Sequence, residues 1–137
     1  MGRNIGLITG AASGIGLKTA KRLLKKGWEI YGLDNDKNGL EQSSEEIDNS
    51  NYIAKPCDLR SEEALKKIFA EIQKNQQKIN ALIACAGVLK LGTLEDMSTE
   101  DFDAVFDINV RGLWLSAREA LPFLKNAASH GELSRII

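Results

Sequence analysis

The residues best suited to chemistry in this sequence are three glycines in the segment TGAASGIG, residues 9–16. Their spacing is typical of a turn that binds the phosphates of a nucleotide. Gly10 allows the chain to leave a strand with dihedral angles that other residues avoid. Gly14 has no side chain to keep a ligand away from the backbone, and Gly16 allows a helix to pack closely. The unpaired N–H groups at the start of that helix suit a pyrophosphate.

A strand before the turn and a helix after it would hold these glycines in place. Residues 5–8 form a short apolar run, as expected for a buried strand. Residues 15–24 place Ile15, Ala20 and Leu24 on one side of a helix and the basic side chains on the other. We therefore expect a strand–turn–helix unit with a solvated basic face.

An acidic residue follows at the distance that a dinucleotide site requires. Residues 29–33 form the next expected strand, and Asp34 lies at its end, close to the offset of about 20 residues that is typical of such sites. A carboxylate there accepts hydrogen bonds from the ribose hydroxyls of adenosine and repels a 2′-phosphate. Neither the glycine turn nor the neighbouring Asn35 adds a positive charge. The sequence therefore favours NAD over NADP.

Other glycine-rich turns fit the sequence less well. A P-loop requires a lysine directly after its last glycine, and Lys18 comes one residue too late. A methyltransferase turn usually reads GxGxG, which this turn does not. Two alternatives remain open: a tight turn followed by a solvated Asp34, and a nucleotide- or adenosyl-binding protein of another Rossmann class.

The segment TGAASGIG resembles the TGxxxGxG cofactor motif of the classical short-chain dehydrogenase/reductase family, and the resemblance extends over the whole chain. It implies an NAD-dependent oxidoreductase that acts on a small alcohol or carbonyl substrate. Asp58 and Leu59 match the residues beside the adenine in that family. The implied cofactor-binding residues are Thr9, Gly10, Ser13, Gly14, Ile15, Gly16, Asp34, Asn35, Asp58, Leu59, Ala86 and Gly87.

Asn109 matches the catalytic asparagine of the family, within a similar pattern from Phe102 to Gly112. The resemblance implies that it holds a water linking the catalytic lysine to solvent; the alternative is a buried structural amide. The chain departs from the family at Ala84-Cys85, where the usual motif has two asparagines. That change puts the attachment of the central strand and the nicotinamide side of the site in question.

Residues 102–124 are expected to form one long helix with apolar side chains nearly all round it. A helix of this kind is buried on more than one side. One side would cover the sheet. By resemblance to the family, the other side would contact a second subunit, and we expect a homo-oligomer.

The catalytic serine and the Tyr-x-x-x-Lys pair of the family are expected after the strand that begins at Arg135, outside these residues. The tyrosines here are Tyr31 and Tyr52, and neither has a lysine four residues later. We therefore expect residues 1–137 to be a single Rossmann dinucleotide-binding domain that ends before those groups and is inactive alone. The alternative is a natural short protein, a non-catalytic dinucleotide-binding or interaction module.

The expected fold is an α/β Rossmann-type doubly wound parallel sheet, incomplete, with five strands in the order 3-2-1-4-5 and helices on both faces. The 137 residues carry a net charge of −1, which does not point to nucleic acid or an anionic membrane. No apolar run is long enough for a membrane span. One histidine and two cysteines suggest no metal site. A cytoplasmic location is expected.

Overall fold

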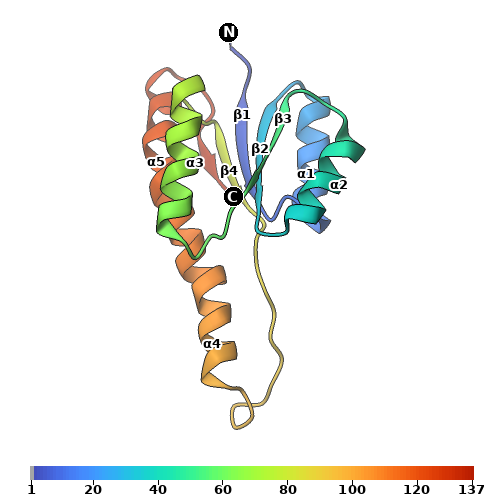
Figure 1. Cartoon of the computed structure of the whole chain (residues 1–137). Helices are drawn as coiled ribbons and strands as arrows, with labels where there is room; N and C mark the ends of the chain where they lie inside the picture. The colour runs from blue at the N-terminus through green and yellow to red at the C-terminus, as the bar shows by residue number, and fades with distance from the viewer. Residues whose placement is uncertain (1) are drawn as a thin grey trace.

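Five parallel strands form one sheet in the order β3-β2-β1-β4-β5 in the computed structural model, which describes residues 2–137 (Figure 1). The strands are β1 (Ile5–Thr9), β2 (Glu29–Asp34), β3 (Tyr52–Pro56), β4 (Ala81–Ala84) and β5 (Arg135–Ile136). The central strand β1 is buried along its whole length. The strand order and the Rossmann-type fold expected from the sequence are confirmed.

Helices cover both faces of this sheet, as Figure 1 shows. One face carries α1 (Gly14–Lys25) and α2 (Lys37–Ile47), and the other carries α3 (Glu62–Asn75) and α5 (Leu113–Ser129). Side chains alternate along β1, so that Leu7 belongs to the core under α3 and α5 and Ile8 to the core under α1 and α2. The central strand is buried on both faces because the crossovers place helices over it, whereas β5 at the edge of the sheet is exposed.

Capping serines mark where two of the helices begin. Ser61 accepts a hydrogen bond from the Ala64 N–H at 3.1 Å at the start of α3. Ser98 does the same for α4 (Thr99–Phe106), where it accepts from the Asp101 N–H at 3.1 Å. Such side-chain caps satisfy N–H groups that have no partner inside the helix. Both serines therefore stabilise the start of the helix that follows them.

The expected helix at residues 102–124 differs from the structure in its middle. A helical segment runs from α4 through η1 (Asp107–Gly112) into α5, but η1 is a π-helical turn rather than an α-helical one. Figure 1 shows α4 extending beyond the carboxyl ends of the strands, away from the sheet. Hydrophobic periodicity did not reveal the wider turn, because it does not distinguish one π-helical turn inside a long helix.

The first helix also differs in one residue from the expected buried face. Ala20 and Leu24 are buried against the sheet, but Ile15 is 77% exposed. Ile15 lies in the first turn of α1, where its side chain borders two hollows. One is a cleft at the carboxyl ends of the strands, and the other is also lined by Ile83 of β4 and by Ile137.

The long helical segment is apolar on two sides. Leu115, Phe123 and Leu124 of α5 are buried against α3 and the sheet. The opposite side carries exposed apolar side chains, which are Phe102, Phe106, Val110, Leu113, Trp114 and Leu121. We call these six residues the outer apolar face. Among residues 2–137, no helix has the length and hydrophobicity needed to cross a membrane.

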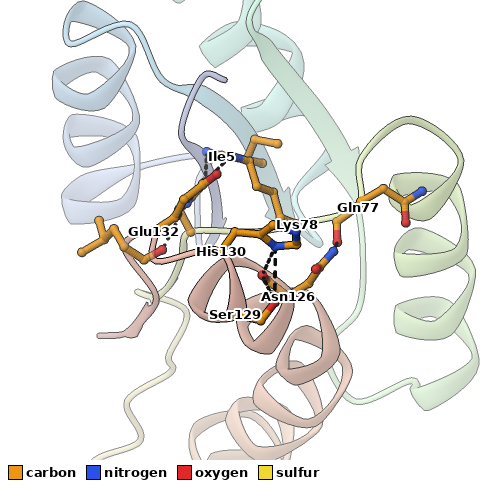
Figure 2. Close-up of polar contacts among 9 residues, drawn as sticks. Ile5, Gln77, Lys78, Asn126, Ser129, His130 and Glu132 are labelled. Carbon is orange, nitrogen blue, oxygen red and sulfur yellow. Dashed lines mark hydrogen bonds and ion pairs between the residues drawn. The ribbon is translucent and has the colours of Figure 1, made fainter. Parts of the chain in front are cut away.

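A buried asparagine that the sequence analysis missed joins the amino ends of three strands. Asn80 is fully buried; its Oδ1 accepts a hydrogen bond from the Ile5 N–H at 2.9 Å. Its Nδ2 donates to Glu132 Oε2 at 3.0 Å and to the Leu133 carbonyl at 3.1 Å. Figure 2 shows Lys78 in an ion pair with the same Glu132 carboxylate. The start of β1, the start of β4 and the loop before β5 therefore meet at one amide.

Replacement of this amide tests how much it stabilises the fold. We expect Asn80→Ala to lower the free energy of unfolding by about 1–3 kcal/mol, because the buried Ile5 N–H loses its acceptor. Urea unfolding followed by circular dichroism measures the change. Asn126→Ala is the matched control, since Asn126 donates to the Gln77 carbonyl from an exposed position (Figure 2). Equal losses in the two variants would contradict the role given to Asn80.

Candidate nucleotide-binding site

A cleft of about 370 Å³ lies at the carboxyl ends of the central strands. The chain leaves β1 toward one face of the sheet and leaves β4 toward the other, so a crevice opens between them. Of the twelve expected cofactor-binding residues, the cleft is lined by Gly10, Ser13, Gly14, Ile15, Gly16, Asp34, Asn35, Asp58, Leu59, Ala86 and Gly87. Further lining residues that the sequence analysis did not name include Ala12, Asp36, Val88 and Ile108.

The glycine turn is packed so closely that side chains would not fit at two of its positions. Gly10 has a positive φ of 69°, and a Cβ there would stand 2.8 Å from the backbone of Ala86. A Cβ on Gly16 would stand 2.1 Å from the carbonyl oxygen of Gly10. The first glycine therefore brings the turn against the segment after β4, and the last brings the start of α1 against the turn.

The start of α1 leaves hydrogen-bond donors facing the cleft. Ser13 occupies the N-cap position, and within residues 2–137 its side chain caps none of the helix N–H groups. The first turn of a helix has unpaired N–H groups and a partial positive charge. Beside Gly14 the space is open, since no heavy atom lies within 4 Å of the position that a Cβ would take. This end of the cleft has the donors and the room that a phosphate group needs.

The carboxylate of Asp34 is held beside the glycine turn by two backbone groups. Its Oδ2 accepts from the Ala12 N–H at 3.1 Å, and its Oδ1 accepts from the Asp36 N–H at 3.0 Å. Each oxygen still has a lone pair for a further donor. The residues that line the cleft, all within the described part of the chain, include three aspartates and no lysine or arginine.

Asp58 lies at the same end of the cleft and is paired with an arginine. The Arg60 guanidinium contacts both carboxylate oxygens, with Nη2–Oδ2 at 2.8 Å and Nε–Oδ1 at 3.0 Å. These hydrogen bonds lower the pKa of Asp58 below its usual value, so the carboxylate stays ionised. Leu59 next to it is buried.

Thr9 lies beneath the cleft rather than in its wall. The side chain is 2% exposed, and its Oγ1 accepts from the Ala86 N–H at 3.2 Å. The Thr9 carbonyl accepts from the Cys85 N–H, also at 3.2 Å. Thr9 thus holds the segment after β4 in register with β1, although Ala84-Cys85 stands where the family has two asparagines.

Asn109 is tied to the loop after β4 by both ends of its amide. Its Nδ2 donates to the Val88 carbonyl at 2.9 Å, and its Oδ1 accepts from the Val88 N–H at 2.9 Å. The side chain is partly buried and lies outside the cleft wall. The two hydrogen bonds attach Asn109 to the loop after β4. Its role as the catalytic asparagine stays a prediction.

Residues 4–137 match the model of the family described as short chain dehydrogenase. The chain belongs to this family. Among its relatives, the 2,3-dihydro-2,3-dihydroxybenzoate dehydrogenase of Bacillus subtilis is 32% identical over 127 residues, 91% of this chain and 49% of that protein. The NAD-dependent glycerol dehydrogenase of Listeria innocua is 34% identical over 114 residues, 83% of this chain and 44% of that protein.

Solved structures of short-chain dehydrogenases share the fold described above. The 3-ketoacyl-(acyl-carrier-protein) reductase from Brucella melitensis complexed with NADH has a TM-score of 0.88 and 32% identity. The similarity covers 97% of this chain and 55% of that one. The chain spans about half the length of the curated relatives it matches. Within residues 2–137, no group of three or more His, Cys, Asp or Glu side chains is arranged to hold a metal ion.

The packing of the glycine turn in this short-chain dehydrogenase chain can be tested by adding single methyl groups. We expect Gly16→Ala to lower the free energy of unfolding by about 3 kcal/mol, because the methyl group overlaps the Gly10 carbonyl and α1 must shift. Gly14→Ala is the matched control; its methyl meets open space, and its positive φ costs about 1 kcal/mol. Denaturant unfolding compares the two, and a larger loss for Gly14→Ala would contradict the packing described.

Proposed function

We propose that this chain supplies the dinucleotide-binding part of an NAD-dependent oxidoreductase that acts on an alcohol or carbonyl compound. The observation that carries the proposal is the cleft in which the glycine turn, the start of α1 and the Asp34 carboxylate face one space. Membership of the short-chain dehydrogenase family supports the reaction class. The whole protein's substrate is a small molecule of that class.

The residues of the cleft suit successive parts of a dinucleotide. The N–H groups at the start of α1 and the Ser13 hydroxyl would bind the pyrophosphate. Asp34 would accept hydrogen bonds from the adenosine ribose, and Asp58 with Leu59 would lie beside the adenine. The backbone at Ala86 and Gly87 would receive the ribose next to the nicotinamide. When bound, the nicotinamide ring supplies hydride transfer.

NAD rather than NADP is the dinucleotide that the charges favour. A 2′-phosphate would stand near Asp34, whose position is fixed by the Ala12 and Asp36 N–H groups. Among the described residues that line the cleft, none carries a positive charge that would offset the repulsion between Asp34 and a 2′-phosphate. The relative from Listeria innocua is named as NAD-dependent, which agrees with this preference.

The proton-transfer groups of the reaction lie outside residues 1–137 in this proposal. A tyrosine and a lysine four residues apart share one helix face, so that the lysine can lower the tyrosine pKa. Tyr31 and Tyr52 lie in strands β2 and β3, and burial raises the pKa of both. Neither phenol suits this role. The same observation favours the second candidate function, a non-catalytic dinucleotide-binding module.

A second copy of the protein is the partner that we propose for the outer apolar face. The six exposed apolar side chains follow one side of the helical segment from Phe102 to Leu121. Aromatic residues and Leu or Val in such a continuous area are typical of an interface between subunits. Association through this face would produce a homo-oligomer, and no nucleic acid or membrane is included in the proposal.

The cofactor preference can be measured by binding, without any turnover. We expect the chain to bind NAD more tightly than NADP in isothermal titration calorimetry. Asp34→Asn keeps the size of the side chain but removes its charge, so NAD should bind about tenfold more weakly, as expected when a charged hydrogen bond is lost. NADP binding should stay equal or improve.

The control for this experiment is Glu45→Gln, which removes an exposed carboxylate of α2 away from the cleft. It should leave both affinities unchanged. Equal weakening of NAD and NADP by Asp34→Asn would show that Asp34 only stabilises the turn.

The proposal places cofactor binding in residues 1–137 and proton transfer outside them, and this separation can be tested. The purified 137-residue chain should bind NAD yet form no NADH from any alcohol, because neither Tyr31 nor Tyr52 lines the cleft or has a lysine four residues later. NADH absorbance monitors the reaction. Steady NADH formation by a preparation of verified mass would refute this assignment of the catalytic groups.

A further inference from the structure

The π-helical turn η1 contacts both loops that border the ends of the cleft. One loop, residues 57–60, follows β3, and the other, residues 85–88, follows β4. In the sheet, β2 and β1 lie between β3 and β4, so no strand pairing links the two loops. Turns of this kind are frequent at functional sites. Here the turn η1 connects two loops that the strand pairing of the sheet does not connect.

Toward the loop after β4, the contact is the amide of Asn109. It forms two hydrogen bonds of 2.9 Å with the backbone of Val88, which lines the cleft. The preceding residue, Ile108, also lines the cleft. The first half of η1 is therefore attached to the loop after β4.

Toward the loop after β3, the contacts are made by Arg111 and Gly112. Arg111 Nη1 donates to the Arg60 carbonyl oxygen at 2.8 Å. Gly112 is buried directly against Leu59; a Cβ on Gly112 would stand 3.1 Å from Leu59 Cβ and 3.4 Å from the Leu59 carbonyl oxygen. A side chain at position 112 would therefore displace the loop.

The contacts continue from this loop to a carboxylate in the cleft wall. The Arg60 carbonyl accepts the hydrogen bond from Arg111. The guanidinium of Arg60 donates to both carboxylate oxygens of Asp58. The hydrogen bonds with Asp58 are the main cause of the raised pKa of Arg60, and the charge of Asp107 in η1 adds a smaller contribution. The position of the Asp58 carboxylate thus depends on η1, although among the described residues neither Arg111 nor Gly112 lines the cleft.

We propose that η1 holds residues 57–60 in the position that recognises adenine, with Arg111 and Gly112 as positioning residues. The inference rests on the proposed function, since it takes Asp58 as the acceptor for the adenine amino group. Arg111 acts through the backbone of Arg60, and Gly112 acts by giving Leu59 room. Neither residue touches the nucleotide.

The test compares NAD with nicotinamide hypoxanthine dinucleotide, in which a carbonyl replaces the adenine amino group. The unsubstituted chain should bind NAD more tightly than the analogue, because the Asp58 carboxylate accepts from an amino group and repels a carbonyl. Arg111→Ala and Gly112→Ala should each bring the ratio of the two Kd values closer to one by about threefold to tenfold, the range set by one hydrogen bond. Calorimetry gives both constants.

Two further variants separate positioning from general damage to the fold. Arg111→Lys keeps a donor for the Arg60 carbonyl and should retain most of the ratio. Arg118→Ala removes an exposed arginine of α5 that pairs with Glu62 and Glu119, and should leave the ratio unchanged. The methyl group of Gly112→Ala presses on Leu59, so the thermal midpoint of this variant is measured beside its two Kd values to show that the chain stays folded while its adenine preference falls.

Each outcome bears on the inference directly. A ratio that is unchanged in both Arg111→Ala and Gly112→Ala, with NAD still bound, would overturn the inference and leave the proposed function standing. A weakening of both dinucleotides by the same factor would also overturn it, because a displaced Asp58 carboxylate must reduce the affinity for NAD more than that for the analogue. If the unsubstituted chain bound neither dinucleotide, the proposed function would fall and the inference with it.

Discussion

The close approach of three backbone segments is the constraint on which the rest of the site depends. The turn after β1, the first turn of α1 and the segment after β4 touch at Gly10, Gly16 and Ala86 with no side chains between them. A methyl group at Gly10 or Gly16 would overlap backbone atoms. The three segments can therefore pack in this way only when both positions are glycine. The direction of the α1 N–H groups, and hence the place where a phosphate can sit, follows from that contact.

The stability of the sheet and the shape of the cleft are determined at opposite ends of the strands. At the amino ends, the fully buried Asn80 connects β1, β4 and the loop before β5. At the carboxyl ends, the backbone is left open to solvent and carries the polar groups of the cleft. Parallel strands make this separation possible, because all of their carboxyl ends lie at the same edge.

Most of the fold and of the cleft wall could be predicted from the sequence, because they depend on local pattern. Residues 5–8 read as a buried strand, residues 15–24 as a helix, and the glycine spacing as a nucleotide-binding turn. The missed features depend on contacts between distant residues. Asn80 gave no local signal, the π-helical turn contacts distant loops through Asn109 and Gly112, and Ile15 borders two hollows instead of packing in the core.

The outer apolar face has a consequence for how the cleft could be regulated by assembly. Phe106 and Val110 of this face alternate along the chain with Asp107, Asn109 and Arg111, which hold the two cleft loops. A partner bound on the outer side of the turn would restrict its motion, and the loops would be restricted with it. Protein concentration would then control nucleotide affinity, because the population with an ordered cleft would grow with the fraction of associated chains.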